Sequence, residues 1–398
     1  MRAYCRGLLL PGERKSIELV AARLGSNRVQ ALHQSMHHVV AKAQWDDMAV
    51  LAQVRREVLP AIERKGIVRY LSVNNVVYMK QGIHSVGVVK QPYGPSAEQE
   101  NCQVAVSLWA SNEIASLPIA YRLFLPAAWI DDPGRRDVAG VPPDIRFETK
   151  ATIALRQLRQ ACSDGVQGSV VLGDAGYGDE ANFRAELEAL GLRYVLAVSS
   201  ATDLWRFEEA RRPVATSGGK QSQGSRLRPL LKQEAMSAKA MAATLPLRAW
   251  RTIKLRVGDR TGLSSRFAAM RVGVRQDDFG GVLGEGKWLL AEWPIDKAEP
   301  TQFWLSDLPS HAGLKSLVWT AKSVWRISAD CQELKQNIGL GHFEGRGWRG
   351  HHHHASLCIA AYGFLVSERC SFPPAQRYAP HQIEALESLP SFRPRGSK

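Results

Sequence analysis

The sequence lacks closely paired cysteines, long apolar runs and an excess of acidic residues. Its six cysteines show no Cys-X-X-Cys spacing, which favours reduced thiols in a cytoplasmic protein. No apolar run approaches the roughly 18 residues that a membrane-spanning helix needs, and even the stretch 357–366 is shorter. No apolar segment follows a basic start, so a secretion signal is not expected. We therefore expect a soluble protein without a membrane partner.

Length and charge describe an ordinary globular chain with a basic surface. The 398 residues are 45% hydrophobic and 23% charged, which suits two or three domains with their own cores. Lysine and arginine outnumber aspartate and glutamate by 52 to 38, giving a net charge of +14. Such a field attracts polyanions, and nucleic acid is the commonest of these. Charge alone does not decide the partner, because many basic enzymes bind no nucleic acid.

The first sixty or so residues have the spacing of helices. Apolar residues at Val29, Leu32, Met36 and Val39 recur at three- and four-residue steps, which predicts one buried helix face. Three helical pieces are expected, the last capped by Asp46 or Asp47 and running to Ile62. Basic side chains on these helices suit DNA phosphates, although a solvated helix face carries the same charges.

From residue 67 the pattern changes to strands and then to alternating strands and helices. Strands are expected at 67–73, 84–89, 102–108, 118–125, 169–174 and 193–198, with helices at 150–162 and 180–190. Antiparallel strands followed by β-α-β units predict an α/β fold with a mixed sheet.

The second half adds a β-rich segment and late helices. Strands are expected at 249–256, 265–274, 287–292 and 302–305, after a basic loop at 217–226, and helices at 315–338 and 355–368. The sequence thus divides into a helical N-terminal DNA-binding domain (1–65), the first part of a core (66–199), a β-rich insertion with the basic loop (200–312), the C-terminal helical part of the core (313–370) and a flexible tail (371–398).

Polar residues end two of the expected core strands. The first strand ends in Asn74 and Asn75, and the strand 169–174 ends in Asp174. Carboxylates at neighbouring strand ends, joined by a third on a late helix, are the arrangement that two divalent cations need. Alone, an acid at a strand end is more often a helix cap or a surface residue, and a pair of asparagines also suits a turn.

Several short segments together resemble a known family. They are His84-Ser-Val-Gly-Val88, Asn101-Cys-Gln-Val-Ala-Val-Ser-Leu108, Leu172-Gly-Asp-Ala-Gly-Tyr-Gly178, Gln332-Glu-Leu-Lys-Gln336 and Glu344-Gly-Arg-Gly-Trp-Arg-Gly350. Over about residues 4–369 the chain resembles the DDE transposases of bacterial insertion sequences, specifically the 701-type family. The resemblance implies an RNase H-like mixed-sheet core with a β-rich insertion before the last carboxylate, and a helical N-terminal region. It also implies Mg²⁺-dependent cut-and-paste movement of DNA, a homodimer on transposon-end-like inverted repeats, and a cytoplasmic, nucleoid-associated location.

Carried over position by position, two of the family's three carboxylates are replaced. The family's first strand ends Asp-Asp-Thr-Gly, where this chain has Asn74-Asn75-Val76-Val77, with Asn75 at the metal-binding place. The second carboxylate matches Asp174. The third lies in an Arg-Trp-Arg-Ile-Glu run, here Val324-Trp-Arg-Ile-Ser328, and the lysine seven residues on is retained as Lys335.

One carboxylate does not offset two dications, so Mg²⁺ binding is expected to be weak or absent. Glu333 and Asp330 lie about 140° and about 160° around the helix from Ser328, so neither takes its place. We expect a catalytically inactive, DNA-binding relative of transposases. Two alternatives stay open: an active transposase with displaced ligands, and a structural relic without a DNA role.

Further residues are candidates for DNA contact. The resemblance points to Arg326, Arg346, Trp348 and Arg349, and the basic loop supplies Lys220, Arg226 and Arg228, which solvation explains nearly as well. The run His351–His354 opens a helix, where only the first and last share a face. Phosphate contact is favoured over zinc for this run, and its role stays open.

Overall fold

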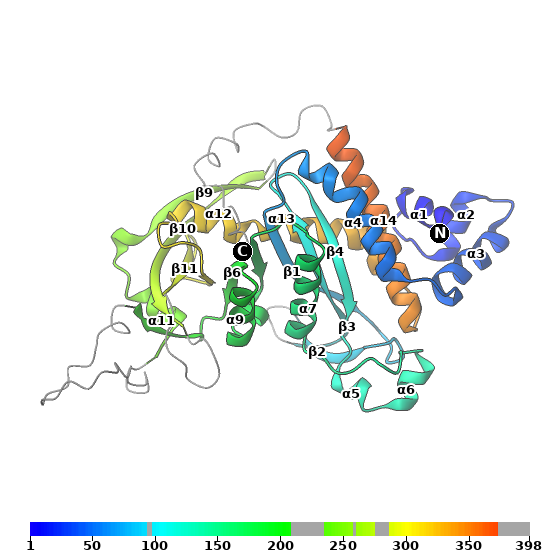
Figure 1. Ribbon diagram of the computed structural model, residues 1–398, viewed down its shortest axis with the longest axis horizontal. Helices are drawn as coiled ribbons and strands as arrows, with labels where there is room; N and C mark the ends of the chain where they lie inside the picture. The colour runs from blue at the N-terminus through cyan, green and yellow to red at the C-terminus, as the bar shows by residue number, and fades with distance from the viewer. Residues whose placement is uncertain (94–97, 208–234, 258–259, 275–285, 373–398) are drawn as a thin grey trace, which may run out of the picture.

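The computed structural model describes residues 1–93, 98–207, 235–257, 260–274 and 286–372. The N-terminal helices lie at one end of the molecule and the β-rich segment at the other, with the core sheet between them (Figure 1). Lys220, Arg226, Arg228 and the tail 373–398 lie outside the described residues. Within the described chain, no helix is both long and apolar enough to cross a membrane.

The N-terminal region is helical, as predicted, but it holds four α-helices instead of three. They are α1 (Arg2–Leu9), α2 (Ile17–Leu24), α3 (Val29–His37), which runs into the π-helical turn η1 (His38–Lys42), and α4 (Asp47–Glu63). Side-chain caps fix two of the starts: Ser16 accepts from the backbone N–H of Leu19, and Asp46 from that of Met48. These bonds satisfy amides that a helix start otherwise leaves open.

The core sheet is mixed, as predicted. Strand β1 (Tyr70–Met79) pairs antiparallel with β3 (Glu98–Ser111), which also pairs with β2 (Val89–Tyr93) and β4 (Ser116–Leu123). On its other side β1 runs parallel to β5 (Val170–Gly173), and β5 runs parallel to β6 (Arg193–Val198). An antiparallel meander continued by parallel strands is the arrangement of an RNase H-like core. The expected strand at 84–89 is wrong except for Val89, because residues 84–88 form turns.

Short and long helices connect these strands. Between β4 and β5 lie α5 (Ala127–Ile130), α6 (Pro133–Val138) and α7 (Lys150–Ser163), and between β5 and β6 lie α8 (Ala175–Gly178) and α9 (Ala181–Ala189). Helix α7 begins at a Thr149 cap and buries its apolar face against the sheet, where Gln157 donates to the Val106 carbonyl at 3.1 Å.

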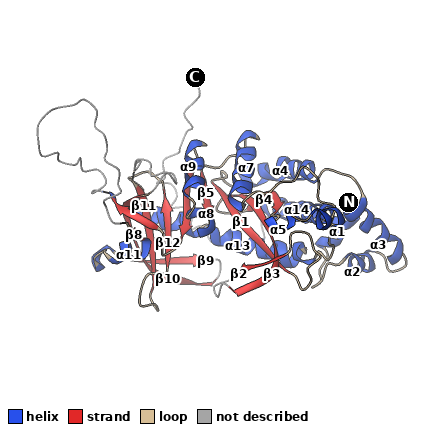
Figure 2. Cartoon of the chain, turned by 90° about the horizontal axis from the view of Figure 1, so that it is seen from below, coloured by secondary structure: helices blue, strands red, loops and turns tan. Residues whose placement is uncertain are grey.

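The β-rich segment extends the core sheet. Its elements are β7 (Asp203–Arg206), β8 (Met236–Ser237), α11 (Ala238–Ala243), η3 (Leu247–Ala249), β9 (Arg251–Val257), β10 (Arg260–Gly273), β11 (Lys287–Pro294) and β12 (Gln302–Ser306). Strand β12 pairs with the core strand β6 and with β11, and β10 pairs with β11. Among the described residues, these strands and those of the core form one sheet of 12 strands. Figure 2 shows the molecule from below.

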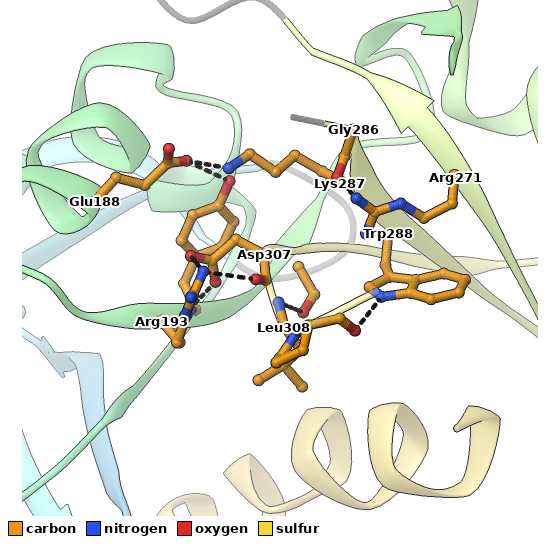
Figure 3. A network of polar contacts seen from close by, with 11 residues as sticks. Glu188, Arg193, Arg271, Gly286, Lys287, Trp288, Asp307 and Leu308 are labelled. Atoms are coloured by element: carbon orange, nitrogen blue, oxygen red, sulfur yellow. Dashed lines mark hydrogen bonds and ion pairs between the residues drawn. The ribbon is translucent and has the colours of Figure 1, made fainter. Parts of the chain in front are cut away.

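A polar network reinforces the junction between the core and the β-rich segment (Figure 3). The ammonium of Lys287 lies 2.6 Å from a carboxylate oxygen of Glu188. The Asp307 carboxylate, just after β12, accepts from the backbone N–H of Tyr194 at 2.6 Å. The two segments are therefore joined by side chains as well as by the β6–β12 ladder.

The late helices differ from the single helix expected at 315–338. Helix α12 (Leu314–Lys322) ends at Ser323 and α13 (Val324–Glu333) follows, continued by η4 (Leu334–Ile338) and η5 (Leu340–His342). The break has a packing reason, since α12 contacts β6 and β10 whereas α13 contacts β1 and β4. The last helix, α14 (Trp348–Ser371), begins seven residues before the expected 355. It packs along α4, its sequence-distant neighbour (Figure 1).

Candidate functional site

Asn75 lies in the middle of β1 and Asp174 follows the end of β5, and the two side chains meet. The expected end of the first strand at Asn74 and Asn75 is wrong, because β1 pairs with β3 as far as Met79. The two strands β1 and β5 run parallel, with Ser72 opposite Leu172, and their pairing stops where β5 ends while β1 continues. Just beyond this pair, Nδ2 of Asn75 donates a hydrogen bond to Oδ2 of Asp174 at 3.1 Å. The sequence predicted this meeting of the two positions.

Asp174 also caps a helix. Its Oδ1 accepts from the backbone N–H of Gly176 at 3.0 Å, at the start of α8. Part of the residue faces solvent, yet the protein packed behind the carboxyl raises its pKa. Hydrogen bonds from Asn75 and Gly176 and the charge of Lys150 act in the opposite direction. Asp174 is thus both the N-cap of α8 and the acid that meets Asn75.

Tyr177 orients Asn75, a role that the sequence analysis missed. Its hydroxyl donates to Oδ1 of Asn75 at 2.8 Å. The ring is buried and lies 5.3 Å from the ring of Phe183, centroid to centroid. Gly178 lets this turn approach β6, because a Cβ there would lie 1.9 Å from the Ala197 carbonyl oxygen. The Asp-Ala-Gly-Tyr-Gly spacing was the available signal, since it places a tyrosine one helical turn after the acid.

Helix α13 crosses the sheet beside β1. Burial raises the pKa of the Cys331 thiol, and Asn74 lies close enough to this thiol to act against that larger effect. Nζ of Lys335 donates to the Val77 carbonyl at 2.9 Å. Ser328 is exposed, and its hydroxyl donates to the Val324 carbonyl one turn back at 3.3 Å. Neighbouring strand residues point to opposite faces. The structure therefore brings Asn75 to Asp174, whereas Ser328 lies on the helix that Asn74 contacts.

The acids that follow Ser328 have other partners. Asp330 accepts from the Ser116 hydroxyl at 2.6 Å, and Glu333 pairs with Arg369 through two bonds of 2.6 and 3.0 Å. Among the residues that the structure describes, no three His, Cys, Asp or Glu side chains are grouped as metal ligands.

The donor set around Asp174 does not fit a divalent cation. Mg²⁺ and Mn²⁺ prefer oxygen ligands and need negative charge around them. Here Oδ2 accepts a hydrogen bond from the NH₂ of Asn75, which carries positive partial charge, while the amide oxygen already accepts from Tyr177. A cation at Asp174 would have to displace this hydrogen bond.

The expected DNA-contacting residues that the structure describes differ in their surroundings. Arg326 donates to the carbonyls of Glu113 and Ile114 at 2.7 and 2.8 Å and so holds the β3–β4 turn. Trp348 is only 7% exposed. Arg346 and Arg349 are exposed, and Arg349 also donates to the Lys42 carbonyl at 3.3 Å.

The histidine run belongs to the core, so the expectation of phosphate contact is wrong for it. All four side chains are buried within α14. His351 hydrogen-bonds Tyr121 at 2.7 Å, and His354 hydrogen-bonds Tyr4 at 2.8 Å. His353 stacks on Trp45 with 3.6 Å between ring centroids. These contacts join the last helix to the N-terminal helices and to β4. Four adjacent histidines point around the whole helix, so helical spacing does not predict that all four are buried.

A mixed sheet of this order, with Asn75 on β1, Asp174 just after β5 and a helix beside β1, defines an RNase H-like protein. Comparison with known families is more specific: the model of the DDE superfamily endonucleases matches residues 1–262. The chain belongs to this family. The match includes Asn75 and Asp174 and ends before Ser328.

Comparison with solved structures gives a distant likeness. The piggyBac transposase synaptic complex with hairpin DNA, solved by cryo-EM, matches at a TM-score of 0.34 and 12% identity, covering 99% of this chain and 77% of that chain. No curated protein matches the chain.

Proposed function

We propose that this protein binds DNA and does not cleave it, as a DDE-family protein whose metal site is dismantled. One observation carries the proposal: the position beside Asp174 holds an amide that donates to the carboxylate, where the 701-type family has an acid. A two-cation mechanism needs several carboxylates to hold its ions.

The surroundings of the site support the loss of catalysis. Ser328 supplies a hydroxyl in place of the third carboxylate, and Asp330 and Glu333 are engaged with Ser116 and Arg369. Lys335 keeps its place beside β1 through its bond to Val77. The scaffold is therefore retained while most of the negative charge is missing, which favours decay of the site over a shift of its ligands.

DNA binding is supported by charge and by family. The net charge of +14 attracts a polyanion, and the family is one of endonucleases. In this proposal the domain 1–65 and exposed arginines such as Arg346 and Arg349 contribute phosphate contacts. A homodimer on paired DNA ends remains an expectation of the resemblance to insertion-sequence transposases.

Nicking of supercoiled plasmid in Mg²⁺ or Mn²⁺ tests the loss of catalysis. We expect no nicking by the wild-type chain. The variant Asn74→Asp/Asn75→Asp/Val324→Arg/Ser328→Glu, which restores the acids and the arginine, should gain metal-dependent nicking that Asp174→Asn removes. Wild-type nicking that Asp174→Asn abolishes would show instead an active enzyme.

Binding of a fluorescein-labelled mixed-sequence duplex tests the DNA role. Affinity that rests on phosphate contacts falls steeply as salt rises. If the protein does not bind the duplex at low salt, the alternative of a structural relic without a DNA role is favoured.

A further inference from the structure

The Asp174 carboxylate has an N–H donor on each oxygen. Oδ1 accepts from the Gly176 backbone at 3.0 Å and Oδ2 accepts from the Asn75 side chain at 3.1 Å. Hydrogen bonds to an ionised acceptor are stronger than neutral ones and stabilise the charge. The carboxylate is therefore neutralised in part by the protein itself.

The orientation of the Asn75 amide is fixed from both ends. The Tyr177 hydroxyl donates to Oδ1 at 2.8 Å, and a reversed amide would place its oxygen against the carboxylate of Asp174. Tyr177 is itself held, because its ring is buried against Phe183. The three side chains form one directed chain from phenol to amide to carboxylate.

We propose that the Tyr177–Asn75–Asp174 chain is a built-in substitute for a bound divalent cation, with the Asn75 amide supplying the counter-charge. This inference deepens the proposed function and rests on it, since it assumes a site without metal. Tyr177 and Asn75 act as positioning residues in it, and the folded site needs no cation.

The substitution Asn75→Asp should reverse this state. It replaces the NH₂ group by an oxygen about as far from Asp174 as the present 3.1 Å, and Tyr177 still donates to the other oxygen. Two carboxylates this close do not both ionise without a shared proton or cation. Their oxygens, unlike the amide nitrogen, are ligands that Mn²⁺ and Mg²⁺ accept.

Thermal unfolding of the full chain in EDTA and in millimolar MnCl₂ tests the proposal. The matched control is Asn74→Asp, which adds the same charge one residue away, on the opposite face of the strand, near Cys331 of α13. We expect Mn²⁺ to leave the wild type and Asn74→Asp unchanged and to raise the melting temperature of Asn75→Asp by about 2–4 °C. A wild type that responds equally, or an Asn75→Asp variant that does not respond, overturns the proposal.

Tyr177→Phe provides a second test if Asn75→Asp does not fold. Without its hydroxyl the amide loses its anchor, so the ionised carboxylate is less well stabilised. The melting temperature in EDTA should fall, and the fall should be much smaller in an Asp174→Asn background, where no carboxylate accepts from the amide. A loss that is the same in both backgrounds overturns the proposal.

Failure of the Asn75 inference can be told apart from failure of the proposed function. Wild-type plasmid nicking that requires Asp174 contradicts the proposed function. An Asn75→Asp variant without any Mn²⁺ response, in a chain that binds DNA and does not nick it, contradicts only the counter-charge role of Asn75.

Discussion

The buried ammonium of Lys322 lies 2.5 Å from a carboxylate oxygen of Glu292. This ion pair joins the end of α12 to β11, and the rings of Trp325 and Trp304 lie 4.4 and 4.8 Å from the ammonium. Burial lowers the pKa of Lys322, and Glu292 acts against this effect. The pair thus holds the late helices on the β-rich segment at the point where α12 gives way to α13.

Removing one partner of this pair should be more harmful than removing both. We expect Lys322→Met to lower the free energy of unfolding by about 3–5 kcal/mol, because Glu292 is left buried and unpaired. The double variant Lys322→Met/Glu292→Gln should recover part of that loss. Urea unfolding of the two single variants and the double variant measures the coupling, and strictly additive effects would contradict a coupled pair.

The carboxyl of Asp307 should make stability depend on pH. Its side chain is 3% exposed, and burial raises its pKa to about 6. Above pH 6 the native state carries the full penalty of an ionised buried acid, and the penalty disappears as pH falls toward the ordinary value near 4. Asp307→Asn should therefore stabilise the chain by up to about 3 kcal/mol at pH 8 and hardly at all at pH 4.

Urea unfolding of Asp307→Asn at these two pH values checks the prediction, with the exposed Asp296→Asn as control. A gain of equal size at both pH values would show that the charge of Asp307 is not the cause. The neighbouring residues Arg193, Lys287 and Glu188 (Figure 3) are not substituted in either variant.

The buried histidines should weaken the protein in acid. Burial lowers the pKa of His354 from its ordinary 6.5 to about 4. A histidine kept neutral by the fold contributes stability that is complete above pH 6.5 and is lost as pH falls toward 4. For His354 alone the loss reaches about 2 kcal/mol at pH 5.

His354→Gln should flatten this dependence, since glutamine does not titrate and its amide can still meet Tyr4 and the Gly339 carbonyl. Urea unfolding at pH 7.5 and pH 5.0 gives the comparison. The exposed His311→Gln serves as control. If the free energy of unfolding falls as much between pH 7.5 and pH 5.0 in His354→Gln as in the wild type, other groups cause the loss.

The sequence predicts that Asn75 and Asp174 lie close together, but it does not predict that Tyr177 orients Asn75. The parallel pairing of β1 with β5 brings Asn75 near Asp174, although β1 does not end there and continues to Met79. The hydrogen-bonded chain was not predictable, because it depends on the rotamer that packing against Phe183 gives to Tyr177. Strand periodicity likewise does not tell which of Asn74 and Asn75 faces α13.

The helices show a similar limit. The pattern from 315 to 338 fits one helix, and only the two separate contacts of α12 and α13 with the sheet explain the break at Ser323. The sequence pattern likewise does not predict which strand pairs with β12. The structure pairs it with β6, which makes the sheet continuous. Both features arise from long-range packing, which local periodicity does not record.

DNA affinity should depend more on Arg346 than on Arg326. Arg346 is exposed, whereas the Arg326 guanidinium is already bonded to the carbonyls of Glu113 and Ile114. If Arg346 contacts one phosphate, Arg346→Ala should weaken binding and reduce the slope of log affinity against log salt by about 0.9. Fluorescence anisotropy with a labelled duplex over a salt series measures this slope.

The control for this series is Lys254→Ala, an exposed cation on the β-rich segment. Equal changes of slope in Arg346→Ala and Lys254→Ala would mean that the protein attracts DNA through its net charge without a defined contact at Arg346. Arg326→Ala should instead lower the melting temperature, because it frees the β3–β4 turn, and should leave the salt slope of the folded protein unchanged. The same three variants thus separate a phosphate contact, a general field and a structural arginine.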